Sequence, residues 1–64
     1  MIIKEGQRIE VKGSFKTSYK KYIALRDFDT QEERWPLYDP QEKEEFHPLG
    51  KRCKIRECKK DGTL

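Results

Sequence analysis

Two cysteines and a histidine near the end of the chain are the residues with the most specific chemistry. Cys53 and Cys58 lie five positions apart, and His47 precedes them. In an extended strand this odd spacing sends the two thiols to opposite faces, roughly 16 Å apart and beyond disulfide reach. Zinc sites usually combine four ligands with paired Cys-x2-Cys spacing. The pattern therefore favours Cys53 in the core and Cys58 as a surface thiol, and it predicts no metal and no other cofactor.

Catalytic chemistry is not indicated either. His47 beside Pro48 could act as a base, but general base catalysis needs a positioned partner and the sequence places none near it. The acids Glu42, Glu44 and Glu45 are typical of a solvated face. A chain of 64 residues also has little room for a closed pocket. We expect no enzyme activity.

Binding chemistry is indicated by the stretch FKTSYKKY, residues 15–22, which holds three aromatic residues and three lysines. If this stretch is a hairpin, one side must face inward, and Phe15 and Tyr22 are predicted to join the core. Tyr19 is then the best candidate for an exposed ring on which a base stacks. The lysines beside it would neutralise phosphates.

Further basic residues extend this candidate surface into the rest of the chain. The predicted nucleic-acid-binding set is Lys16, Tyr19, Lys20, Lys21, Arg26, Lys51, Arg52, Lys54 and Arg56, with Arg34 and Trp35 expected on a flanking loop.

These side chains need short strands to position them. Residues 9–15 alternate apolar and polar side chains, which predicts a half-buried strand, and Gly13 within it suggests a bend. Gly6 marks a turn after a short segment at Ile2 and Ile3. Residues 16–18 are expected to be a hairpin loop and residues 19–28 a central strand, followed by a turn at 27–30.

The second half of the chain predicts two more strands and a helix. Residues 31–37 should lead into a short strand that Pro36 places at an edge or interrupts. Asp39, Pro40 and Glu42 have the spacing of a capping box, which predicts a short helix over residues 40–46 that ends before Pro48. Residues 51–60 alternate again and predict a last strand with a basic outer face.

Together these elements predict a mainly β fold. Four or five short strands with one helix near residues 40–46 suit a small, strongly bent antiparallel sheet or barrel of the OB or SH3-like kind. The 64 residues make one domain, and a domain of this size buries only about 60% of its unfolded surface. Seven aromatic residues and a net charge of only +3 favour a folded chain over a disordered one.

Charge is distributed unevenly along the chain. Residues 1–26 carry seven basic and two acidic residues, residues 27–46 two and eight, and residues 47–64 six and two, giving +5, −6 and +4. If the first and last blocks are neighbours in space, they form a basic face. With two cysteines, no secretory leader and no long apolar run, we expect a soluble cytoplasmic protein that does not bind membranes.

Two functions fit these features. The first is a module that binds single-stranded DNA or RNA, since no recognition helix is available for a duplex groove. The alternative is a protein-interaction module, such as an adaptor, small subunit or regulator, that uses its separate acidic and basic faces to orient a partner. Such charge segregation would also permit head-to-tail self-association, and the oligomeric state stays open.

Overall fold

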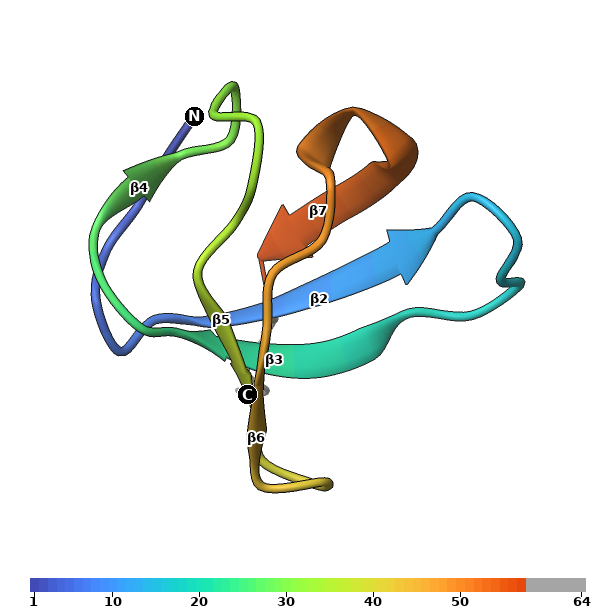
Figure 1. The fold of residues 1–64 in the computed structure, drawn as a ribbon, viewed down its shortest axis with the longest axis horizontal. Coiled ribbons are helices and arrows are strands. Elements are labelled where there is room, and N and C mark those ends of the chain that lie inside the picture. Colours follow the sequence, from blue (N-terminus) through green and yellow to red (C-terminus); the bar gives the residue numbers. More distant parts are fainter. Residues whose placement is uncertain (58–64) are drawn as a thin grey trace.

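The computed structural model describes residues 1–57, and its main element is an antiparallel sheet of five strands. The order across this sheet is β6-β5-β3-β2-β7, and a separate two-stranded ladder pairs β1 with β4. In Figure 1, β2 and β3 run side by side across the centre, and β7 lies next to β2. Strands β5 and β6 run steeply across β2 and β3. The mainly β prediction is confirmed. Among the described residues β6 and β7 are edges, so the sheet is open and not a closed barrel.

Strands β2 (Arg8–Gly13) and β3 (Lys20–Ala24) form the central hairpin. Ile9 and Val11 are buried while Arg8, Glu10 and Lys12 lie on the opposite face, as the alternation predicted. Ile9 lies opposite Tyr22 and Val11 opposite Lys20. The strands are shorter than predicted, because the loop that joins them occupies residues 14–19.

The last described strand, β7 (Cys53–Glu57), pairs with β2 along its full length, from Ile9 opposite Glu57 to Gly13 opposite Cys53. Cys53 and Ile55 pack against the core, while Lys54 and Arg56 point to the outer face, as predicted. The first and last basic blocks are therefore neighbours. Residues 58–60 of the predicted strand, and Cys58 with them, lie outside the described residues.

The helix predicted over residues 40–46 is not formed. Strands β5 (Leu37–Asp39) and β6 (Glu44–Phe46) make a hairpin there instead. The Asp39 carboxylate does accept hydrogen bonds from the amides of Gln41 and Glu42, at 3.0 and 3.2 Å. Lys43 then adopts a left-handed φ of 58°, which reverses the chain after one turn. No apolar stripe at helical spacing follows Glu42, so a longer helix would gain no stability from packing against the core.

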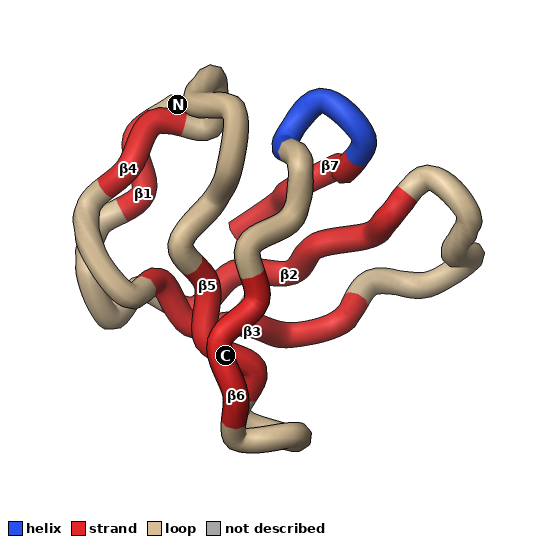
Figure 2. The backbone as a smooth tube through the Cα atoms, viewed as in Figure 1, coloured by secondary structure: helices blue, strands red, loops and turns tan. Residues whose placement is uncertain are grey.

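The helical segment found among the described residues is instead a single 3-10 turn, Gly50–Arg52, just before β7 (Figure 2). It is tied to the segment after β4: the Gly50 amide donates to the Glu33 carbonyl at 2.9 Å, and the Trp35 amide donates to the Pro48 carbonyl. Pro36 precedes β5, which lies inside the sheet between β3 and β6 and not at an edge. The proline is tolerated because it lies outside the ladder, where its carbonyl accepts from the Leu25 amide.

The two-stranded ladder closes one end of the core, at the left of Figure 1. It pairs β1 (Ile2–Ile3) with β4 (Phe28–Asp29), so the segment predicted as an exit turn contains a short strand. Gly6 has a φ of 80° and forms the predicted turn after β1. The buried apolar core is Ile3, Ile9, Val11, Tyr22, Ala24, Phe28, Trp35 and Leu37.

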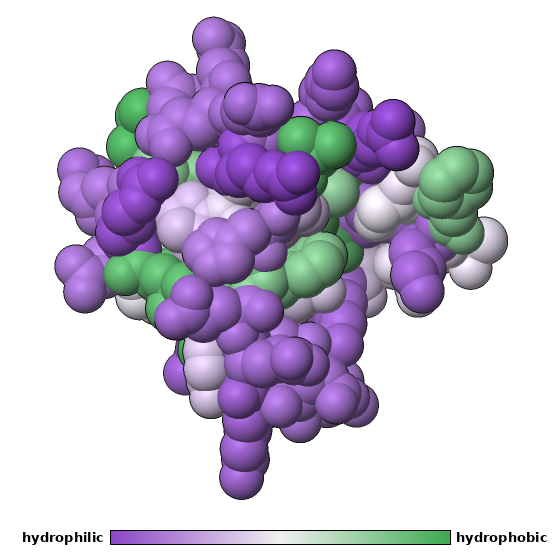
Figure 3. Space-filling model, viewed as in Figure 1, coloured by the Kyte–Doolittle hydropathy of each residue, from purple (hydrophilic) through white to green (hydrophobic). Residues whose placement is uncertain are grey.

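Phe15 is not part of this core. Its side chain is 94% exposed in the β2–β3 loop. Figure 3 shows a largely hydrophilic face with apolar groups near its centre and at its right edge. The prediction failed because β2 ends at Gly13, two residues before Phe15, so the alternation that would turn its side chain inward no longer applies.

No helix within residues 1–57 has the length and apolar character needed to cross a membrane.

Candidate nucleic-acid interface

Among the described residues, positive charge is concentrated where β2 and β7 meet the β2–β3 loop. A groove of about 310 Å³ there is lined in part by Gly13, Ser14 and Cys53. Its remaining lining residues are all basic; we call it the basic groove, after Lys12, Lys16, Lys51, Arg52 and Lys54. Within residues 1–57, no acidic residue lines the groove and none of the five cations has an ion-pair partner.

The sheet register itself brings two of these cations together. Lys12 on β2 lies directly opposite Lys54 on β7. Like charges opposite one another across strands are destabilising, and a bound anion between them would relieve that repulsion. The repulsion between Lys12 and Lys54 therefore destabilises the fold, and a bound phosphate would reduce it.

A second feature, on the outer face of the sheet, surrounds Tyr19. The Arg56 guanidinium lies 3.9 Å from the centre of the tyrosine ring, and the Lys12 ammonium lies 5.4 Å from it. Arg56 also donates from Nε to the carboxylate of Glu10, its neighbour on β2. The Tyr19 ring is therefore half-buried and partly covered by cations, so less of it is open to a base than the sequence predicted.

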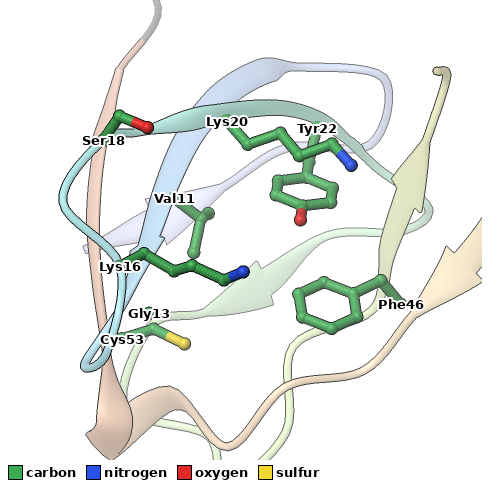
Figure 4. Close-up of a pocket in the computed structure, with 8 residues that line it drawn as sticks. All are labelled: Val11, Gly13, Lys16, Ser18, Lys20, Tyr22, Phe46 and Cys53. Atoms are coloured by element: carbon green, nitrogen blue, oxygen red, sulfur yellow. The ribbon is translucent and has the colours of Figure 1, made fainter.

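The opposite, concave side of the sheet holds a third feature, a cavity of about 250 Å³ shown in Figure 4. We call it the aromatic cavity; it is lined by Val11, Gly13, Lys16, Ser18, Lys20, Tyr22, Phe46 and Cys53. The Tyr22 and Phe46 rings stack with their centres 5.2 Å apart. Burial raises the pKa of the Tyr22 hydroxyl and of the Cys53 thiol, so both groups are protonated at neutral pH.

The predicted site residues thus divide into separate groups. Lys16, Lys51, Arg52 and Lys54 line the basic groove. Tyr19, Lys21 and Arg56 lie on the outer face, where Lys21 is opposite Glu10.

Two of the predicted residues are engaged elsewhere. Lys20 turns to the concave side, where its ammonium pairs with the buried Asp39 at 2.8 Å. Arg26 pairs with Glu32 at 3.2 Å and donates to the Asp27 carbonyl. Of the flanking residues, Arg34 donates to the His47 carbonyl, and Trp35 is only 2% exposed.

The sequence prediction missed three residues. Lys12 was placed on the polar face of its strand, but its role depends on Lys54 lying opposite, a contact between positions 42 residues apart. Phe46 was assigned to a helix, and Tyr22 to the core alone. Strand β6 has only three residues, which is too few for an alternating pattern to be recognised in the sequence. The stacked pair of Tyr22 and Phe46 is therefore seen only in the folded hairpin.

The chain matches no protein-family model, and comparisons with curated proteins and with solved structures give no significant match. Its function is therefore inferred from the geometry of the molecule.

Proposed function

We propose that this protein binds single-stranded DNA or RNA, with the phosphate backbone in the basic groove. The observation that carries the proposal is the groove itself: five cations from two strands, one loop and the 3-10 turn line one depression, and no acidic residue within residues 1–57 lines it. Backbone contacts of this kind supply most of the affinity of proteins that bind single strands without strong sequence preference.

The bent sheet supports the same proposal. We propose that it is a partly open barrel of the OB or SH3-like kind, with the strand-joining loops around the groove acting as the binding surface. The bend lets residues of the outer edge strand β7 and of the β2–β3 loop face one depression. Tyr19 and the exposed Phe15 flank it and offer limited stacking.

The test is a titration of a fluorescently labelled oligo-dT or oligo-U strand, followed by anisotropy at several salt concentrations. If all five cations contact phosphates, the logarithm of the binding constant should fall with a slope of about −3.5 against the logarithm of salt concentration, since each contact on a single strand contributes about 0.7. Raising salt from about 50 to 200 mM would then weaken binding roughly 100-fold.

Matched variants locate the interface. Lys54→Ala should weaken binding and make the salt slope shallower by about 0.7, because one phosphate contact is lost. Lys4→Ala is the control: it removes the same charge from a lysine that pairs with Asp27 outside the groove. Arg26→Ala should behave like this control. Equal effects of Lys54→Ala and Lys4→Ala, or no binding by the wild type at low salt, would refute the proposal.

A protein-interaction module is the second candidate, and the β5–β6 hairpin is the observation that favours it. All three residues of β6 are exposed, this strand is an edge, and the hairpin holds Glu42, Glu44 and Glu45. An exposed edge with acidic side chains would suit a basic partner segment that adds a strand.

A further inference from the structure

The aromatic cavity and the basic groove are parts of one continuous surface. Gly13, Lys16 and Cys53 line both of them. Figure 4 shows the Lys16 side chain, which comes from the β2–β3 loop, extending between Val11 and Cys53 toward the tyrosine and phenylalanine rings. A phosphate in the groove would therefore leave its own nucleotide close to the mouth of the cavity.

The walls of the cavity suit a flat ring. The stacked Tyr22 and Phe46 rings are inclined by 19° and form one wall, and Val11 and Cys53 lie across from them (Figure 4). Phe46 is 40% exposed, so part of its ring is available to a further aromatic group. The volume of about 250 Å³ lies just below the usual range of ligand pockets, about 300–1,000 Å³, which suits a single small ring system.

The polar groups of the cavity are dominated by hydrogen-bond donors. Lys16 and Lys20 can only donate, and the Lys20 ammonium already pairs with Asp39. Ser18 and Tyr22 each carry a hydroxyl that can donate or accept. Tyr22 is a neutral phenol at neutral pH, and burial raises the pKa of its hydroxyl further. Among the residues that the structure describes, no carboxylate, amide or imidazole side chain lines the cavity. A ligand edge made of carbonyl oxygens could accept from all of these groups, whereas an amino group could donate only to the two hydroxyls.

We propose that the aromatic cavity takes one base of the strand held in the basic groove, and that it selects a pyrimidine with carbonyl groups at both positions, thymine or uracil. This inference rests on the proposed function and adds base selectivity to it. Stacking against Phe46 holds the ring, and the Ser18 and Tyr22 hydroxyls donate to its carbonyl oxygens. The Lys16 ammonium, which has three donors, bridges a carbonyl oxygen and the phosphate in the basic groove.

The experiment compares unlabelled oligo-dT, oligo-dC and an abasic strand of equal length as competitors for labelled oligo-dT. Thymine and cytosine are both single rings of similar size, but cytosine carries an amino group in place of one carbonyl. We expect oligo-dC to compete about fivefold less well than oligo-dT, the effect of roughly one net hydrogen bond. The abasic strand should compete least while keeping the same salt slope.

Tyr22→Phe is the decisive variant, since it keeps the ring and removes only the hydroxyl. It should reduce the preference for oligo-dT over oligo-dC and leave the salt slope unchanged. Tyr38→Phe is the matched control: Tyr38 lies on the opposite face of the sheet, where it is paired with Ile23 and Glu45. Phe46→Leu provides a second test, because it keeps an apolar side chain on the exposed edge strand but removes the stacking surface.

The outcomes separate this inference from the proposal beneath it. Salt-dependent binding with equal affinity for oligo-dT, oligo-dC and the abasic strand would overturn the base pocket and leave the basic groove standing. A preference for oligo-dT that persists unchanged in both Tyr22→Phe and Phe46→Leu would place selectivity elsewhere and overturn the pocket as well. Absence of any binding by the wild type would overturn both.

Discussion

Single residues in this protein carry charge in two different ways, and the difference depends on their neighbours. Arg56 and Lys20 each pair with a carboxylate, Glu10 and Asp39 respectively. Lys12 and Lys54 face one another instead. Paired cations have their charge balanced within the fold, whereas like charges opposite one another across two strands favour an anion from outside. The sequence prediction included Lys20 among the binding residues because its charge alone does not reveal which of these roles it has.

Asp39 illustrates the stabilising role and yields a pH prediction. The hydrogen bond from Lys20 lowers the pKa of the Asp39 carboxyl, and the amides of Glu42 and Gln41 lower it further, against the opposing effect of burial. A carboxyl whose pKa is lower in the folded state stabilises the fold above its unfolded pKa, which is about 3.9. That contribution is lost as pH falls through the folded value.

Asp39→Asn should therefore lower the melting temperature near pH 7, and the gap between variant and wild type should narrow as pH falls below roughly 4. Thermal melts followed by circular dichroism would measure this. Asp27→Asn is the control, since Asp27 is well exposed and its pair with Lys4 spans 3.8 Å. The interpretation is wrong if the gap stays constant from pH 7 to pH 2.5.

The elements of the fold depend on close packing at a few crossing points. The 3-10 turn Gly50–Arg52 lies against Trp35, whose indole donates to the Thr30 carbonyl at 3.1 Å. A Cβ atom on Gly50 would be 2.4 Å from the indole nitrogen and 2.6 and 2.9 Å from two ring carbons. Trp35 also packs against Phe28 of β4, so this contact joins the two-stranded ladder to the segment before β7.

Gly50→Ala should consequently destabilise the domain by about 1–3 kcal/mol, the usual cost of forcing an extra group into a packed core. Urea unfolding followed by the fluorescence of the buried Trp35 would report it. Gly13→Ala makes the same change where the nearest atom to the new Cβ, a carbon of Lys16, is 3.7 Å away. It should shift the midpoint little, and equal shifts for both variants would argue against the Trp35 contact.

Charge is unevenly placed across the sheet: the basic groove lies where β2 pairs with β7, and the β5–β6 hairpin at the other edge holds Glu42, Glu44 and Glu45. A fold with this arrangement would present a basic edge and an acidic edge to different partners. Charge reversal on the hairpin therefore distinguishes the two candidate functions.

Reversal of Glu42, Glu44 and Glu45 to lysine should leave or increase the affinity for oligo-dT, since the added positive charge attracts the strand from a distance. Under the protein-interaction alternative, the same variant would lose its partner. Anisotropy titrations of wild type and triple variant at equal salt measure the first effect. A large loss of affinity for the strand would contradict a phosphate site at the basic groove.

The sequence predicted those features of the fold that depend on residues close together in the chain, and it did not predict contacts between distant residues. The alternation of residues 9–13 and 53–57 correctly placed Ile9, Val11 and Ile55 inside and Lys54 and Arg56 outside. Four of the predicted site residues meet in the basic groove. Local patterns could not predict the ion pairs of Lys20 with Asp39 and of Arg26 with Glu32, since the two partners of each pair lie in different parts of the fold.

The sequence by itself determined the mainly β character, the facing of the long strands and the existence of two basic blocks, because these depend on period-two patterning and composition. Tertiary structure alone decided which charges meet. The register of β2 with β7 sets Lys12 against Lys54, and the β5–β6 hairpin brings Phe46 onto Tyr22. The hydrogen bonds from the Gln41 and Glu42 amides to the Asp39 carboxylate can form in a helix or in a turn, so this local signal does not distinguish the two. Packing against the rest of the sheet favours the hairpin.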